Sequence, residues 1–182
     1  MKEIIKMTSF LAVVSFAAGI GLSLTNYVTD PIIKKEKVES YKTSLKEVMP
    51  NADDYKTGDN RVDFLRQTKF IAVSKDNKIT GEIFVMEEKG YGGKVKVLVG
   101  INNDKEVTGI KILEHKETPG LGSLAESPEK MPGKDFSFLE QFKGRKLSDK
   151  WEVKKDIAAI TGATITTRAV TKAVLKALNS KD

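Results

Sequence analysis

Several threonine hydroxyls gather near the C-terminal end of the sequence, where residues 160–167 read ITGATITT. A threonine oxygen can contact a phosphate or carry a phosphate ester, and the N–H groups that open a helix attract anions. The residues that follow, 167–178, have apolar side chains at helical spacing, so we expect an amphipathic helix that begins close to Thr166 and Thr167. The stretch is therefore either an anion site or only a helix N-cap formed by Thr164, Thr166 or Thr167.

Two glycine-rich segments offer a second place for a ligand: Gly90–Gly93, which reads GYGG, and Thr118–Gly122, which reads TPGLG. Each is either a simple turn or a place where the backbone closely approaches a phosphate or a planar ligand. Neither has the spacing of a dinucleotide fingerprint or a phosphate-binding P-loop. His115 lies between the acids Glu114 and Glu117, as a general base can, but no serine or cysteine nucleophile accompanies it in a recognisable arrangement. A hydrolase that uses His115 is therefore the last-ranked hypothesis.

Composition excludes several kinds of site. The 182 residues suffice for one domain and an appendage. The chain has no cysteine and one histidine, which excludes disulfides, thiolate-held clusters and a histidine-rich metal site. The net charge of +6 comes from lysines interspersed with acids, without a basic cluster among aromatic residues. This pattern favours a solvated surface and no nucleic-acid partner.

An apolar segment lies near the start of the chain. Residues 7–28 carry no charge, and about 20 such residues suffice to span a membrane as a helix. We interpret residues 7–28 as a retained transmembrane anchor in preference to a cleaved signal peptide, because the small residues lie inside the apolar stretch instead of after it. Lysines flank both sides of the segment, so the charge pattern leaves its orientation open.

The rest of the chain predicts an α+β fold in which helices flank an antiparallel sheet. Pro31 marks a break or a helix start, and residues 32–48 have a helical apolar period. Residues 57–60 read as a loop. Strands are expected at residues 70–73, 79–86, 94–99 and 107–113, with connections too short for parallel crossovers. A short helix that faces the core is expected around residues 136–142.

The order of these features resembles a known family. One apolar span, Gly90–Gly93, the Glu117–Gly122 segment ETPGLG and the Thr161–Thr164 motif TGAT follow one another along the chain. Together they resemble the covalent-FMN-binding domain family, specifically the G subunit of the Rnf ion-translocating electron transport complex. The C subunit of sodium-pumping NADH:quinone reductase is a close relative of that protein. The resemblance covers nearly the whole chain.

The resemblance implies a cofactor and its site. A flavin transferase would attach FMN through its phosphate to the hydroxyl of Thr164, the last threonine of the motif. The implied cofactor-binding residues are Thr161, Gly162, Ala163 and Thr164 in the motif, Glu117, Thr118, Gly120, Leu121 and Gly122 in the second glycine segment, and Tyr91 and Gly93 in the first. One position departs from the family pattern. The usual aspartate three residues before the first threonine is Ala158 here, and the nearest acid is Asp156.

The resemblance also implies location and partners. Residues 1–6 would be a cytoplasmic N-terminus, residues 7–28 a single-pass anchor in the cell (inner) membrane, and residues 29–182 an extracytoplasmic FMN-binding domain. The protein would be an electron-carrier subunit among the other membrane subunits of an Rnf-type ferredoxin:NAD oxidoreductase, rather than an enzyme on its own. Two alternatives stay open: a C-type subunit of the quinone reductase, and a non-redox extracytoplasmic module that binds a partner or an anionic ligand.

Overall fold

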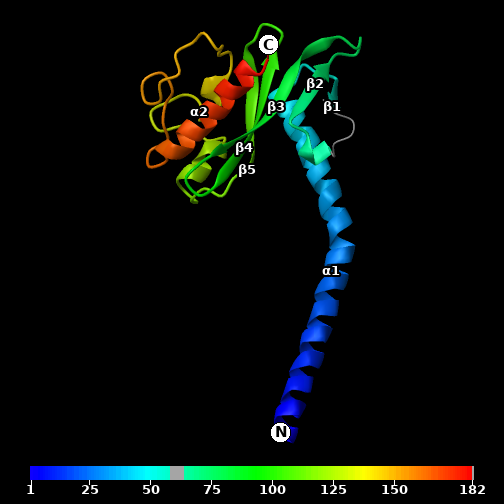
Figure 1. The fold of residues 1–182 in the computed structure, drawn as a ribbon. Helices are drawn as coiled ribbons and strands as arrows, with labels where there is room; N and C mark the ends of the chain where they lie inside the picture. The colour runs from blue at the N-terminus through cyan, green and yellow to red at the C-terminus, as the bar shows by residue number, and fades with distance from the viewer. Residues whose placement is uncertain (58–63, 182) are drawn as a thin grey trace. The chain divides into compact units, whose positions relative to one another are not determined.

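The computed structural model describes residues 1–57 and 64–181, and within them two α-helices accompany a five-stranded sheet (Figure 1). This confirms the α+β class. Of the predicted loop at residues 57–60, residues 58–60 lie outside the described residues. The elements in chain order are α1 (Lys2–Val48), β1 (Asp54–Thr57), the 3-10 turn η1 (Phe64–Arg66), β2 (Lys69–Val73), β3 (Ile79–Lys89), β4 (Lys94–Asn102), β5 (Val107–Glu114), the 3-10 turns η2 (Gly122–Glu126) and η3 (Glu140–Phe142), and α2 (Thr164–Asn179).

The sheet is antiparallel throughout, in the order β1-β2-β3-β4-β5. Its four longer strands are the predicted ones, joined by short connections because each strand pairs with the next in sequence. The fifth strand, β1, was not predicted. Asp54–Thr57 is a strand because it pairs with β2, with Tyr55 opposite Ala72.

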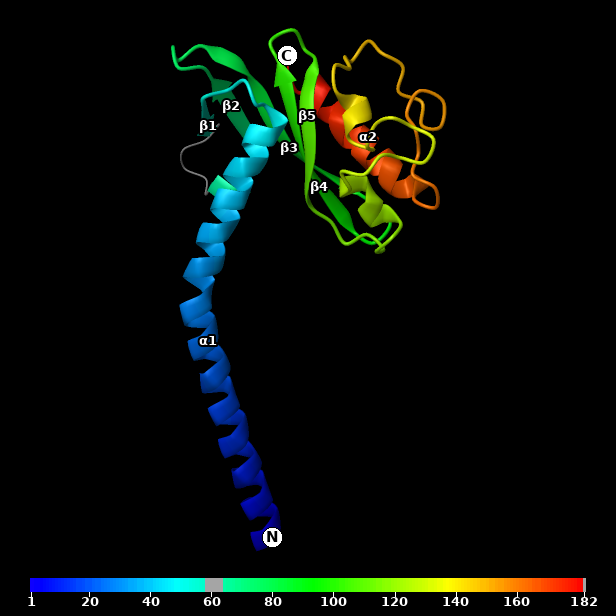
Figure 2. The ribbon, with the colours of Figure 1, turned by 180° about the vertical axis from the view of Figure 1, so that it is seen from behind.

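Successive side chains of β4 point to opposite faces of the sheet, and both faces are buried. Val95, Val97 and Val99 lie in a cluster with α2, whereas Leu98 lies in a second cluster with Leu45 from the last turns of α1. These turns therefore cover one face of the sheet and α2 covers the other (Figures 1 and 2). The Thr108 hydroxyl also donates a hydrogen bond to the carbonyl of Val48 at 2.8 Å, which ties the end of α1 to β5.

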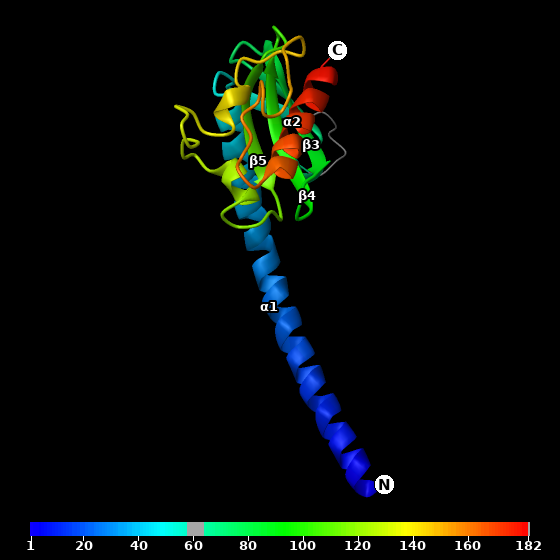
Figure 3. The same cartoon turned by 90° about the vertical axis from the view of Figure 1, so that its left-hand side faces the viewer.

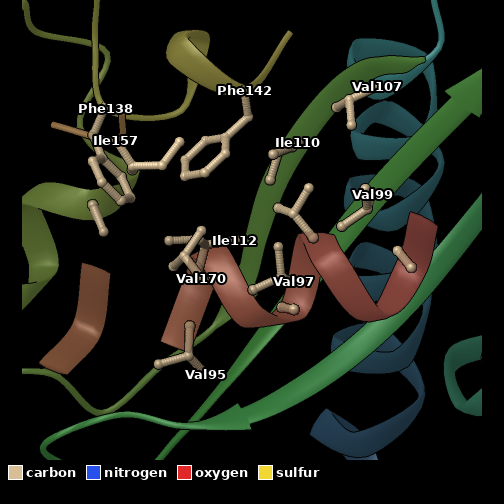
Figure 4. Close-up of a cluster of buried hydrophobic side chains, with 14 of the residues drawn as sticks. Val95, Val97, Val99, Val107, Ile110, Ile112, Phe138, Phe142, Ile157 and Val170 are labelled. Carbon is tan, nitrogen blue, oxygen red and sulfur yellow. The ribbon is translucent and has the colours of Figure 1, made fainter. Parts of the chain in front are cut away.

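The connection between β5 and α2 consists of loops and short helical turns (yellow to orange in Figure 3). The short helix expected near residues 136–142 is the 3-10 turn η3, with Phe138 and Phe142 fully buried. Figure 4 shows these rings beside Ile157, facing valines of β4 and Val170 of α2. The hydrophobic contacts thus hold the irregular connection against the start of α2.

The helix α1 contains the expected apolar segment. It includes a window long and apolar enough to cross a membrane, and none of that window is buried within the described chain. The break or helix start expected at Pro31 is wrong, because α1 continues through the proline. A proline removes one backbone donor from the helix, and a long helix can retain its neighbouring turns. By its internal contacts the chain falls into two units, Met1–Ser40 and Tyr41–Asp182.

Candidate flavin site at the start of α2

The helix α2 begins at Thr164, and Ala163 occupies the N-cap position. The predicted helix start near Thr166 and Thr167 is therefore wrong. The alternative of an N-cap formed by Thr164, Thr166 or Thr167 is also wrong. Thr166 and Thr167 are both buried, and the Thr166 hydroxyl donates to the carboxylate of Glu117. The Thr167 hydroxyl donates to the carbonyl of Ala163 at 3.1 Å and accepts the N–H of Ile160 at 3.2 Å.

The first turn of α2 is open to an anion. No described side chain caps it, because alanine has no hydrogen-bonding group to offer the first N–H groups. The residue before the cap, Gly162, has a φ of 78°, in the left-handed region that favours glycine. A Cβ there would lie 2.9 Å from Cδ2 of Leu121. Gly162 thus allows both the turn into the helix and the close approach of the opposite loop.

Two side chains from the η3 region hold the loop that leads to Thr164. The Gln141 amide accepts the N–H of Ala158 at 2.8 Å and donates to its carbonyl at 3.2 Å. The guanidinium of Arg145 donates to the carbonyls of Gln141, Lys150 and Asp156 at 3.0, 3.0 and 2.7 Å. The position of the threonine motif therefore depends on residues about 20 positions earlier.

Glu117 joins three segments around the site. Its buried carboxylate accepts the N–H of Gly92 at 3.1 Å and the hydroxyl of Thr166 in a short hydrogen bond. Gly122 makes room for it, since a Cβ on Gly122 would lie 2.6 Å from Oε2 of Glu117. The carboxylate thus links the two glycine segments to the first turn of α2.

His115 supports the same loop. Its Nδ1 accepts the N–H of Glu117 at 3.1 Å, and its Nε2 lies 3.1 Å from Oε1 of Glu126. These partners assign the ring proton to Nε2, which donates to the Glu126 carboxylate. Both nitrogens therefore have internal partners, as expected of a structural histidine rather than a general base.

A cavity of about 510 Å³ opens where these segments meet. Tyr91, Leu121 and Ile165 form apolar walls and remain 72%, 44% and 48% exposed, while Thr118 and Thr164 add hydroxyls. Large apolar side chains exposed around a hollow indicate a site for an apolar ligand. The cavity is lined by Tyr91, Glu117, Thr118, Leu121, Gly122, Gly162, Ala163, Thr164, Ile165 and Thr166.

Most residues predicted for the site line this cavity, and three do not. Thr161 lines a neighbouring hollow, Gly93 lies in another hollow beside His115, and Gly120 forms a turn with a φ of 75° and donates its N–H to Ser123. Sequence reasoning missed Ile165 as a wall residue, although an apolar side chain among hydroxyls was a usable signal. No signal in the sequence pointed to Gln141 or Arg145.

The geometry suits a flavin mononucleotide. Apolar walls with hydroxyls among them can hold a planar ring with polar edges, and an uncapped helix N-terminus beside Thr164 suits a phosphate. Within residues 1–57 and 64–181, no group of three or more histidine or acidic side chains gathers to hold a metal ion. The apolar walls, the hydroxyls and the helix N-terminus together fit FMN.

Residues 90–179 match the FMN-binding domain family. More particularly, the chain belongs to the family of G subunits of ion-translocating oxidoreductase complexes. It is 34% identical to the G subunit of the proton-translocating ferredoxin:NAD(+) oxidoreductase complex of Clostridium ljungdahlii, covering 97% of this chain and 90% of the relative. It is 32% identical to the G subunit of the Na(+)-translocating complex of Acetobacterium woodii, covering 95% and 89%.

A solved structure shares the fold. The C subunit of the Na(+)-translocating NADH-quinone reductase of Parabacteroides distasonis superposes with a TM-score of 0.54 at 17% identity. The match covers 79% of this chain and 89% of that one. At this identity the likeness shows the fold alone.

Proposed function

We propose that this protein is a membrane-anchored flavoprotein subunit that transfers electrons within an ion-translocating ferredoxin:NAD oxidoreductase complex, with FMN esterified to Thr164. The family membership and the length over which the chain matches the G subunits support the choice of complex. The other subunits of that complex and a flavin transferase are the partners. Bound FMN would supply electron-transfer chemistry, and the residues of this chain hold and orient it.

The observation that carries the assignment is the position of the Thr164 hydroxyl. Thr164 is half-buried, opens α2 and lines the apolar cavity. Thr166 and Thr167 are buried at 1% and 0% exposure with their hydroxyls bound internally, and Thr161 is exposed but does not line the cavity. Thr164 is therefore the motif hydroxyl that combines access, the cavity and the helix N-terminus.

Attachment exchanges one phosphate bond for another. The Thr164 oxygen bonds to the phosphorus of an activated flavin nucleotide, the bond from phosphorus to the leaving group breaks, and the hydroxyl proton is released. The remaining negative charge on the phosphate lies beside the uncapped N–H groups of α2, which stabilise an anion. Tyr91, Leu121 and Ile165, which line the cavity, would hold the apolar ring and exclude water from it.

The alanine at position 158 does not prevent the motif from being presented. Both backbone groups of Ala158 are held by Gln141, so the loop geometry needs no acid at that position. Asp156 is engaged elsewhere, since its carboxylate accepts the N–H of Glu152 at 2.9 Å. We therefore expect a flavin transferase to modify this chain with alanine at position 158.

The proposed topology places residues 1–6 in the cytoplasm, residues 7–28 in the membrane and residues 29–182 outside the cytoplasm. A helix that can span the bilayer and the membership in the G-subunit family of ion-translocating complexes support this arrangement. A covalent bond to FMN suits such a location, because free FMN would be lost by dilution outside the cell.

The test is co-expression of the full chain with a flavin transferase, followed by denaturing electrophoresis under ultraviolet light. The unaltered chain and a Thr161→Val control should give a fluorescent band, and Thr164→Val should give none. A fluorescent Thr164→Val band would overturn the site. A colourless unaltered chain that still assembles with its partner subunits would favour the non-redox binding module.

A further inference from the structure

A second hollow also has Thr164 in its lining. It has a volume of about 680 Å³, and Thr164 and Gly162 line both this hollow and the apolar cavity. Four of the residues that line it are cationic, against a single acid, Asp156. The cations are Lys134, Arg145, Lys154 and Lys155. We name this hollow the basic pocket.

The positive charge of the basic pocket is largely uncompensated. Within residues 1–57 and 64–181, no carboxylate lies within ion-pair distance of Lys134 or Lys154. The donors of Arg145 go to backbone carbonyls, which leave its charge without a counterion. Lys155 pairs with Glu152 at 2.8 Å. Three of the lining cations, Lys134, Arg145 and Lys154, therefore have no carboxylate partner among the described residues.

The two hollows differ in chemistry and share Gly162 and Thr164 in their linings. The first cavity has the apolar walls of Tyr91, Leu121 and Ile165, whereas the basic pocket is lined by the four cations. A flavin nucleotide has the same division, with an apolar ring at one end and a phosphate at the other. Cations that line a concave site favour a phosphate over a neutral group.

We infer that the basic pocket is the phosphate subsite of the flavin nucleotide, and that Lys134 and Lys154 determine selection of FMN over uncharged riboflavin. This inference rests on the proposed function, because it assigns the phosphate to the same ligand. Arg145 has two roles. Its N–H groups hold the loop before Thr164, and its charge adds to the positive charge of the basic pocket. Lys134 and Lys154 are exposed and carry no such structural bonds through their side chains, so they can be changed without disturbing the loop.

The experiment measures equilibrium binding of free flavins to the full chain in detergent. Thr164→Val is used as the background, so that no covalent product forms. Quenching of flavin fluorescence gives the Kd of FMN and of riboflavin at low ionic strength and at high salt. In the same background, Lys134→Gln with Lys154→Gln should weaken FMN binding by up to about fivefold per lysine, the range of exposed ion pairs. Riboflavin binding should stay unchanged, and added salt should remove the FMN preference.

Lys143→Gln is the matched control, because Lys143 is an exposed lysine that lines a different hollow. It should leave both flavin affinities as they are. Lys134→Gln alone provides a second variant if the double variant shows altered circular dichroism. Inorganic phosphate should compete with FMN and not with riboflavin.

A second readout uses Thr164 intact and a flavin transferase. The initial rate of flavin incorporation should fall in the lysine variants and stay unchanged in Lys143→Gln. Two outcomes would overturn the inference, each together with an incorporation rate that the lysine variants leave unchanged. One is equal affinity for FMN and riboflavin, and the other is no binding of either flavin. If the lysine variants lose phosphate binding while FMN binding is unaffected, the pocket is a site for free phosphate, which also overturns it. An FMN preference without any covalent product would instead contradict only the proposed ester.

Discussion

The hydrogen bond between Thr166 and Glu117 ties the first turn of α2 to the loop that forms one wall of the candidate flavin site. Thr166→Val keeps the shape of the side chain and removes the hydroxyl. The buried carboxylate then keeps the backbone N–H of Gly92 as a donor and loses the Thr166 hydroxyl. A hydrogen bond to a charged group contributes about 1.5–3 kcal/mol, so the free energy of unfolding should fall by about that amount.

A matched control is available further along α2. Thr171 is also buried, and its hydroxyl donates to the backbone carbonyl of Thr167 at 2.8 Å. That acceptor is neutral, so Thr171→Val should lower the free energy of unfolding by about 1 kcal/mol or less. Both substitutions replace one β-branched residue by another in the same helix, which leaves helix propensity nearly equal.

The assay is urea unfolding of the full chain in detergent, followed by the fluorescence of Trp151. This is the single tryptophan, and it stacks on Phe142 with centroids 6.2 Å apart, so it reports on the domain core. Equal losses for Thr166→Val and Thr171→Val would refute the reasoning, because they would show that the Glu117 carboxylate gains nothing special from the Thr166 hydroxyl.

Three further predictions concern other contacts. Phe142→Ala should lower the free energy of unfolding by about 3–5 kcal/mol in the same urea assay, because the ring is fully buried; a loss below about 1 kcal/mol would contradict its core position. Gly162→Ala should lower that free energy by roughly 1–2 kcal/mol, since a φ of 78° strains alanine, and should also slow flavin incorporation. Hydrogen bonding to Lys94 lowers the pKa of Glu87, so the folded state binds fewer protons than the unfolded state. The stability that this pair contributes is therefore present above the ordinary glutamate pKa and is lost as pH falls through the lowered pKa of Glu87. Lys94→Gln should flatten this part of the curve of unfolding free energy against pH. An unchanged curve would refute the pairing.

The sheet was predictable because its turns and strands carry local signals. Asn77 lies in the turn predicted between β2 and β3, and has a φ of 59°, a conformation that asparagine tolerates. The alternating charged and apolar residues at the start of β4 indicated a half-buried strand, but the structure buries both of its faces, because Val97, Leu98 and Val99 are all fully buried. The strand β1 was not predictable, because its pairing with β2 determines its structure and its own residues carry no alternating apolar pattern.

The site was predictable where a short motif carries it and not where distant contacts do. The threonine motif and the Glu117–Gly122 segment indicated the cavity, and the structure brings them together at the start of α2. The start of the helix was misjudged by about two residues, because the Thr166 hydroxyl bonds to Glu117 and the Thr167 hydroxyl bonds to the backbone of Ile160 and Ala163, so that neither residue is the N-cap. The support from Gln141 and Arg145 goes largely to backbone carbonyls, whose positions no sequence pattern reveals.

The central claim is that one oxygen, that of Thr164, carries FMN, and peptide mass spectrometry tests it most directly. Cleavage after Lys155 and Arg168 releases residues 156–168, which contain Thr161, Thr164, Thr166 and Thr167 together. After co-expression with a flavin transferase, this peptide should gain the mass of one FMN less one water, and fragmentation should place the gain on Thr164. An unmodified peptide, or a gain on any of the other three threonines, would contradict the account.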